Sequence, residues 1–203
     1  NVIMIVMVRY WFFALFVLAI AARAPGGLRA AARTRNPTLQ ISRGVLLVVE
    51  ICVLVAAFTL LGLVESHAVF ACYPLLVAAL SGPVLGEHVG RLRWAAIGVG
   101  FIGVMIILQP GFGVFSLTAM IPLASAFLFA IYALLTRFAA SRDTATTSFF
   151  WTGIAGAVAM SLAGVWFWQP LSPQDLGWMS LLCIFGAAAH WGLIKCYAMA
   201  EAS

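Results

Sequence analysis

Long hydrophobic stretches separated by short polar segments recur along the whole chain. Seven are present, at residues 2–22, 44–64, 67–86, 94–109, 116–138, 146–168 and 176–198. An α-helix needs about 20 apolar residues to cross a bilayer, because it rises ~1.5 Å per residue through ~30 Å of hydrocarbon. The stretch 94–109 reaches this length when Arg91, Arg93 and Gln109 are counted as interfacial ends with snorkelling side chains. Since backbone groups in lipid must be satisfied internally, the pattern predicts seven transmembrane helices.

Composition excludes the soluble classes of protein. Hydrophobic residues make up 65% of the 203 residues and charged residues 8%, which is too few to cover a soluble surface. The four cysteines lie singly in hydrophobic stretches, without the spacing of a disulfide framework or a zinc site. Because the sequence also lacks a nucleophile with its base, a His-Glu-x-x-His motif and a phosphate loop, we expect no enzyme, catalytic residue, metal site or cofactor.

Basic residues are concentrated in alternate connections between the stretches. Nine of the 11 lie in the connections 23–43, 87–93 and 137–143, whereas the connections near Ser66, Pro110 and Pro170 contain none. The positive-inside rule predicts that the three basic connections are cytoplasmic. The net charge of +5 is therefore attributed to orientation and to contact with the lipid bilayer, and not to nucleic acid.

Both ends of the chain suggest an internal piece of a longer bundle. The chain starts at Asn1 directly in a hydrophobic run, and it stops in a short polar segment after Ala200. A faint internal repeat points the same way, because a helix followed by a polar break with Glu and Ser occurs at 56–66 and again at 197–203. Aligning these copies leaves an odd number of helices between equivalent positions, which inverts the second copy in the membrane.

Several residues carry a resemblance to a known family. They are Arg9, the run Ala68-Val69-Phe70-Ala71-Cys72-Tyr73-Pro74-Leu75, the pair Gly86-Glu87, and Trp94-Ala95-Ala96-Ile97-Gly98 through Gly103-Val104. In these residues the chain resembles the EamA-type permeases of the drug/metabolite transporter superfamily, which have ten helices in two inverted repeats of five. The resemblance implies that residues 1–110 form most of the first repeat, as its second to fifth helices. Residues 111–203 would form part of the second repeat, as the sixth to eighth helices.

The same resemblance implies a function and a location. We expect an all-α polytopic protein of the bacterial inner membrane that moves small organic metabolites or drugs by alternating access. The partner would be a small-molecule solute, together with protons if a gradient drives transport. The oligomeric state is not indicated. A competing hypothesis is a membrane bundle that binds a ligand or serves a structural role without transporting anything.

Arg9 and Tyr73 are the first candidates for solute binding. A charge at the centre of a membrane helix costs on the order of 2.5–3.5 kcal/mol, so Arg9 needs a partner or a wet cavity. Arg9 lies roughly 21 Å along its helix from Arg23, and Tyr73 lies ~9 Å in from the outer end of its own helix. Similar depth predicts that the two bind an anionic or polar group of the solute. The alternative is that Arg9 snorkels to the membrane surface.

Glu50 and His190 are the candidates for proton coupling. They lie about 10 Å and about 12 Å from the cytoplasmic face, respectively, and similar depth permits contact. A carboxylate beside an imidazole in a low-dielectric cavity can titrate near neutrality and pass a proton. The alternative is that each side chain bonds a hydroxyl or a backbone carbonyl of a neighbouring helix.

Two polar stripes predict faces that line a cavity. Their members recur at helical spacing, at Thr118, Pro122, Ser125, Phe129, Tyr132 and Thr136 and at Cys183, Ala187, His190, Ile194, Tyr197 and Glu201. Hydroxyl and aromatic side chains on one face favour solute binding by Ser125 and Tyr132, with Trp151 of the sixth stretch as an aromatic wall. Interhelical packing, or for Trp151 a place in the interfacial aromatic belt, are the alternatives.

Overall fold

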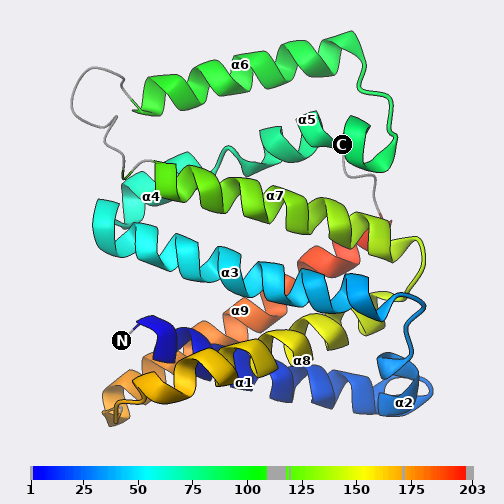
Figure 1. The fold of residues 1–203 in the computed structure, drawn as a ribbon, viewed down its shortest axis with the longest axis vertical. Helices are drawn as coiled ribbons and strands as arrows, with labels where there is room; N and C mark the ends of the chain where they lie inside the picture. The colour runs from blue at the N-terminus through cyan, green and yellow to red at the C-terminus, as the bar shows by residue number, and fades with distance from the viewer. Residues whose placement is uncertain (1, 109–117, 119, 171, 200–203) are drawn as a thin grey trace. The chain divides into compact units, whose positions relative to one another are not determined.

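The computed structural model describes residues 2–108, 118, 120–170 and 172–199, and in this range the chain is helical (Figure 1). The elements are α1 (Val2–Arg23), α2 (Gly27–Ala32), α3 (Pro37–Leu61), α4 (Leu63–Phe70), α5 (Tyr73–Leu85), α6 (Arg91–Leu108), α7 (Met120–Ala140), α8 (Ala145–Gly164), the 3-10 turn η2 (Val165–Phe167) and α9 (Pro173–Met199). The described ranges contain no strand, which confirms the all-α prediction.

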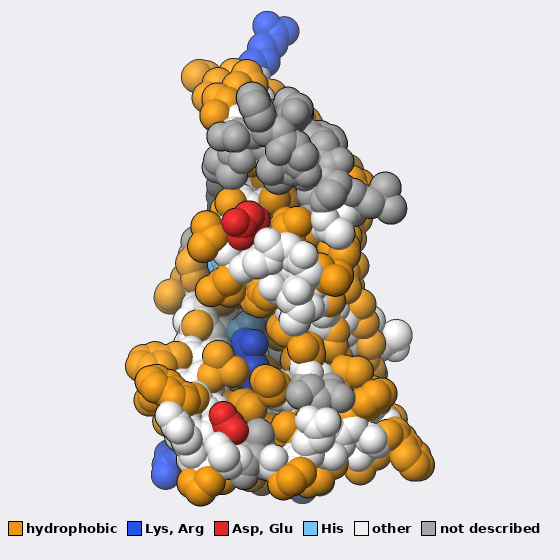
Figure 2. Space-filling view, turned by 90° about the vertical axis from the view of Figure 1, so that its left-hand side faces the viewer, with side chains coloured by type: hydrophobic (Ala, Val, Ile, Leu, Met, Phe, Trp, Pro, Cys, Tyr) orange, Lys and Arg blue, Asp and Glu red, His pale blue; other side chains and the backbone are white. Residues whose placement is uncertain are grey.

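Within these ranges, six segments are long and apolar enough to cross a membrane. They are Val2–Arg23, Pro37–Leu61, Leu63–Leu85, Met120–Ala140, Ala145–Phe167 and Pro173–Met199. They correspond to six of the seven predicted stretches, and hydrophobic side chains dominate the face shown in Figure 2. The protein is therefore a polytopic helical membrane protein. The remaining stretch, 94–109, forms most of α6, which has 18 residues and is not among the six. A seventh span stays a prediction, as do the ten-helix bundle and the repeat boundary at 110/111.

The helices form two compact units. The first unit comprises the described residues of Asn1–Val48 and Thr136–Ala200, and the second comprises those of Val49–Leu135. The first unit thus contains α1, α2, α8 and α9 with the start of α3 and the end of α7. The second contains α4, α5 and α6 with the remainders of α3 and α7.

A seam of glycines brings α1 and α8 together in the first unit. A Cβ added at Gly153 would lie 2.8 Å from Val17, and one at Gly164 would lie 2.8 Å from Met7. At Gly156 the added atom would lie 2.1 Å from Cε1 of Tyr10. Small residues let helix backbones approach closely in lipid, where packing and hydrogen bonds replace the hydrophobic drive of water. The glycines therefore explain why α1 and α8 lie side by side (Figure 1).

The two polar stripes face inward. On α7, Pro122, Ser125, Tyr132 and Thr136 are buried and Phe129 is half-buried. The described members of the α9 stripe, at 183, 187, 190, 194 and 197, are likewise buried or half-buried. Residue 201, the last predicted member, lies outside the described ranges.

The turn between the second and third spans is not where polarity predicted it, and the third span is itself interrupted. Glu65 and Ser66 lie inside α4, because neither residue stops a helix. The chain instead leaves α3 at Gly62, whose φ of 97° suits a residue without a Cβ. A second interruption separates α4 from α5 at residues 71–72. Pro74, in the first turn of α5, has no N–H to donate to the carbonyl four residues earlier, so the helix cannot continue regularly through this point.

Candidate functional site

Aromatic side chains gather at the break in the third span. Phe70 and Tyr73, on either side of the interruption, have ring centroids 5.3 Å apart. Both rings contact Phe129 of α7, at 5.5 and 4.8 Å, and Phe129 in turn lies 5.8 Å from Tyr132. We call Phe70, Tyr73, Phe129 and Tyr132 the aromatic cluster. Interrupted membrane helices commonly form the solute sites of transporters, so this cluster is the first candidate site.

A buried carboxylate lies next to the cluster. Glu50 is 2% exposed, and its Oε1 accepts a hydrogen bond of 2.8 Å from Ser125 Oγ. Ser125 precedes Phe129 by one helical turn on the same face of α7. Four of the predicted residues, Tyr73, Ser125, Tyr132 and Glu50, thus belong to one region of the second unit. The hydroxyl bond matches the structural alternative for Glu50, and its coupling role stays a prediction.

Arg9 is the eighth residue of α1, which runs from Val2 to Arg23, and its side chain approaches the backbone of α9. A Cβ added at Gly186 would lie 3.3 Å from both Nε and Nη2 of Arg9. The guanidinium is also close enough to Cys183 and His190 to interact with them electrostatically. In the described part of the chain, Arg9 makes no hydrogen bond or ion pair to another side chain. Solute binding by Arg9 stays a prediction.

Aromatic rings also surround His190. Its ring centroid lies 5.8 Å from that of Phe13, which packs edge-on against Phe149 at 5.0 Å. Phe149 contacts Trp191 at 4.9 Å. His190 and Arg9 therefore share the interior of the first unit, whereas Glu50 and Tyr73 belong to the second. The pairs Arg9 with Tyr73 and Glu50 with His190 stay predictions.

Trp151 stabilises one end of the first unit. Its Nε1 donates a hydrogen bond of 3.1 Å to the backbone oxygen of Ala32, the last residue of α2. The indole thus lies at the end of the span that carries the basic connection, which agrees with the interfacial alternative. A role in solute binding stays a prediction.

A buried network around Arg43 was not predicted from the sequence. Arg43 was assigned to the loop 23–43, but α3 begins at Pro37 and the side chain is 0% exposed. Its Nε donates to Thr136 Oγ1 at 3.0 Å and its Nη2 to Thr152 Oγ1 at 2.9 Å. Its Nη1 donates to Gln40 Oε1. The guanidinium therefore joins α3 to α7 and α8 through the bonds to Thr136 and Thr152, and the bond to Gln40 stays within α3.

Asp143 extends this network to two connections. It accepts hydrogen bonds from Gln40 Nε2 at 2.8 Å, from the Thr34 hydroxyl and from the backbone N–H of Arg35 at 3.2 Å. Partial burial alone raises the pKa of Asp143, but these hydrogen bonds and the charge of Arg35 outweigh it and hold the pKa below its usual value. The contacts place the connections 23–43 and 137–143 at the same end of the first unit, as the orientation prediction requires.

Comparison with known proteins supports a transport role. The chain is 33% identical over 141 residues to a riboflavin transporter of Vibrio cholerae, covering 68% of this chain and 47% of that protein. It is 32% identical over 200 residues to a riboflavin transporter of Rhizobium johnstonii, covering 96% of this chain and 64% of that protein. It is 22% identical over 173 residues to an S-adenosylmethionine uptake transporter of Rickettsia prowazekii, covering 85% and 59%, respectively.

The extent of these matches determines how specifically the chain can be assigned to a family. The chain spans 47% and 64% of the length of the two riboflavin transporters. No family model matches, so membership of the EamA family stays a prediction. Within the described ranges, no group of three His, Cys, Asp or Glu side chains could hold a metal ion. The chain is an integral membrane protein similar to transporters of small organic molecules.

Proposed function

We propose that this protein transports riboflavin across the bacterial inner membrane by alternating access. The observation that carries the proposal is the similarity to two riboflavin transporters, at 33% and 32% identity. The three basic connections would face the cytoplasm, and two inverted repeats would rock about a site near the middle of the bilayer. The chain would act as a permease and not as an enzyme.

The aromatic cluster suits the chemistry of this solute. Riboflavin has a flat, uncharged three-ring system and a flexible chain of hydroxyl groups. Aromatic pairs contribute about 0.5–1.5 kcal/mol each beyond the apolar area that they bury, in stacked or edge-to-face geometry. Tyr73 and Phe129 already pack edge-to-face at 4.8 Å, so a ligand ring has edges and faces to pack against. Ser125 and Glu50, one turn away, offer a hydroxyl and a carboxylate to the ligand hydroxyls.

Arg9 and the ionisable pair complete the proposed mechanism. Arg9 would donate hydrogen bonds to carbonyl oxygens of the solute once the two repeats close around it. Glu50 or His190 would bind and release a proton in each cycle if a gradient drives uptake. S-adenosylmethionine is the second candidate solute, because a carboxylate beside aromatic rings also suits a sulfonium cation. The weaker identity of that relative, 22%, places it second.

Uptake into proteoliposomes tests the proposal. Purified protein is reconstituted, and uptake of radiolabelled riboflavin is measured with and without a proton gradient, with unlabelled S-adenosylmethionine as competitor. Tyr73→Ala and Phe129→Ala should each raise KM by roughly tenfold, the factor that corresponds to about 1.4 kcal/mol. Phe127→Ala is the matched control, because Phe127 is also on α7 but is 46% exposed, and its KM should be unchanged.

Each outcome of this assay is decisive. Uptake no faster than in protein-free liposomes rejects riboflavin transport, and saturable binding without uptake supports the non-transporting bundle instead. Absence of riboflavin uptake together with uptake of radiolabelled S-adenosylmethionine, measured in a parallel assay, moves the assignment to the second solute. Gradient-driven uptake that is unchanged in both Glu50→Gln and His190→Ala rejects the coupling assignment alone.

A further inference from the structure

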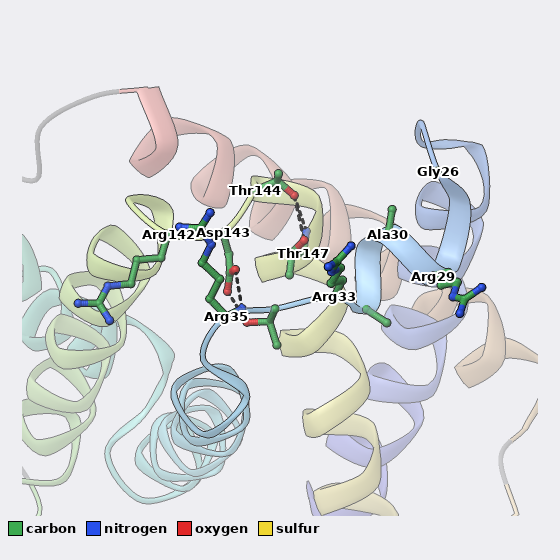
Figure 3. Close-up of a pocket in the computed structure, with 11 residues that line it drawn as sticks. Gly26, Arg29, Ala30, Arg33, Arg35, Arg142, Asp143, Thr144 and Thr147 are labelled. Carbon is green, nitrogen blue, oxygen red and sulfur yellow. Dashed lines mark hydrogen bonds between the residues drawn. The ribbon is translucent and has the colours of Figure 1, made fainter.

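A cavity of about 1010 Å³ opens at the end of the first unit where two basic connections meet (Figure 3). It is lined by α2, by the connection that follows α2, by the loop before α8 and by the first turn of α8. This volume is at the upper end of the range for ligand pockets, about 300–1000 Å³. The cavity lies beyond the end of α1 at Arg23 and beside the starts of α3 and α8. It is therefore at the ends of the spans, where a bilayer has its headgroups, and none of its lining residues belongs to the aromatic cluster.

The lining of the cavity is strongly basic. Arg29, Arg33, Arg35 and Arg142 contribute to it, and Asp143 is the one carboxylate among the described lining residues. In Figure 3 the Arg33 and Arg35 side chains lie near the centre of the view, and those of Arg29 and Arg142 extend toward opposite sides. The four guanidinium groups therefore outnumber the carboxylate.

The main role of Asp143 is to hold the walls of the cavity together, and it offsets only part of their positive charge. Its oxygens accept hydrogen bonds from the Gln40 and Thr34 side chains and from the Arg35 backbone. These bonds fix the connection after α2 against the loop before α8. Across the described ranges, the side chains of Arg29 and Arg33 make no hydrogen bond or ion pair. The wall thus presents Arg29 and Arg33 as charges without an ion pair in the described ranges, beside Arg35, whose charge Asp143 offsets in part.

Phosphate is the anion that this arrangement suits best. The guanidinium group is planar and presents paired N–H donors that match two phosphate oxygens, and it keeps its charge at every physiological pH. We propose that this cavity binds a phosphate group, carried either by the headgroup of an anionic phospholipid or by a soluble phosphate ester. Bound phosphate links α2 and its connection to the start of α8. The proposal stands whether or not riboflavin is the solute.

Binding measurements with matched variants test this site. The purified protein is exchanged into zwitterionic detergent, and its thermal unfolding is followed while dioctanoyl phosphatidylglycerol, dioctanoyl phosphatidylcholine or adenosine monophosphate is titrated. The test variant is Arg33→Gln with Arg35→Gln, both exposed side chains. The control is Arg91→Gln with Arg93→Gln, which removes the same charge from the first turn of α6, a segment that does not line the cavity.

We expect a phosphate ligand to stabilise the parent protein in a saturable manner. The apparent Kd should rise at least about tenfold in the Arg33/Arg35 variant and change less than about twofold in the control. Restoring charge as Arg33→Lys with Arg35→Lys should recover only part of the affinity, because an ammonium cannot make the paired contact. Saturation by phosphatidylglycerol alone identifies the lipid headgroup, and saturation by adenosine monophosphate identifies a soluble ester. No saturable response to either ligand, or equal weakening in the test and control variants, overturns the proposal.

Discussion

The seam between α1 and α8 makes the stability of the first unit sensitive to a single methyl group. In Gly156→Ala the new Cβ would lie 2.1, 2.5 and 3.0 Å from Cε1, Cδ1 and Cζ of Tyr10. The ring has little room to move, because Tyr10 is 2% exposed and packs against Phe13 at a centroid distance of 6.0 Å. The methyl group must therefore push the two helices apart.

The size of the effect follows from two opposing terms. Overpacking a well-packed interior costs about 1–3 kcal/mol. Replacing glycine by alanine inside a helix contributes up to ~1 kcal/mol in the other direction. We therefore expect Gly156→Ala to lower the free energy of unfolding by about 1–2 kcal/mol, measured by denaturant titration in detergent micelles.

Gly192→Ala provides the control. Gly192 is inside α9, and an added Cβ there meets nothing within 4 Å, so only the helix-propensity term remains. This variant should be as stable as the parent or slightly more stable. A Gly156→Ala protein that equals Gly192→Ala in stability would refute the reasoning. A double-mutant cycle with Tyr10→Leu should recover part of the loss, because the smaller side chain vacates the position of the ring edge.

Three further predictions concern the basic end of the first unit. Arg43→Lys should lower the free energy of unfolding by about 2–4 kcal/mol, because one ammonium cannot reach all three acceptors, and a loss below about 0.5 kcal/mol in denaturant titration contradicts this. Hydrogen bonds hold the pKa of Asp143 below its ordinary value in the folded protein. Its contribution to stability is therefore present above the ordinary pKa and disappears as pH falls through the lowered pKa. Acid titration of stability should therefore be flatter in Asp143→Asn than in the parent, and identical profiles speak against the network. Trp151→Phe should lower the free energy of unfolding by about 0.5–1.5 kcal/mol, because the hydrogen bond to Ala32 is lost. The KM of uptake should not change, and a raised KM would support the prediction that Trp151 is an aromatic wall of the solute site.

The sequence predicted the spans well because the bilayer imposes their length. It also predicted the inward face of α7, since the spacing from Pro122 to Thr136 follows the helical repeat. The structure differs from the sequence prediction where polar residues predicted the end of a helix. Glu65 and Ser66 continue α4, and the turn depends on the positive φ of Gly62, which hydropathy does not report.

Tertiary partners were harder to predict than depth. Arg43 was counted as an interfacial charge, because its partners Thr136 and Thr152 are 93 and 109 residues away in the chain. Polar residues at helical spacing, at 40 and 43 on α3 and at 148 and 152 on α8, were the available clue. Depth along a helix gives the height of a side chain but not the direction in which it points. The sequence therefore paired Arg9 with Tyr73, and Glu50 with His190, on their depth in the membrane alone.

The contact between α1 and α8 also sets the order in which the protein assembles. Trp11 Nε1 donates to Ser161 Oγ at 2.8 Å across 150 residues of sequence. At ~5–20 residues per second, the ribosome needs on the order of 8–30 s to make the intervening chain. During that interval the face of α1 that packs against α8 and α9 has no partner, so the first unit can form only after α9 has been made.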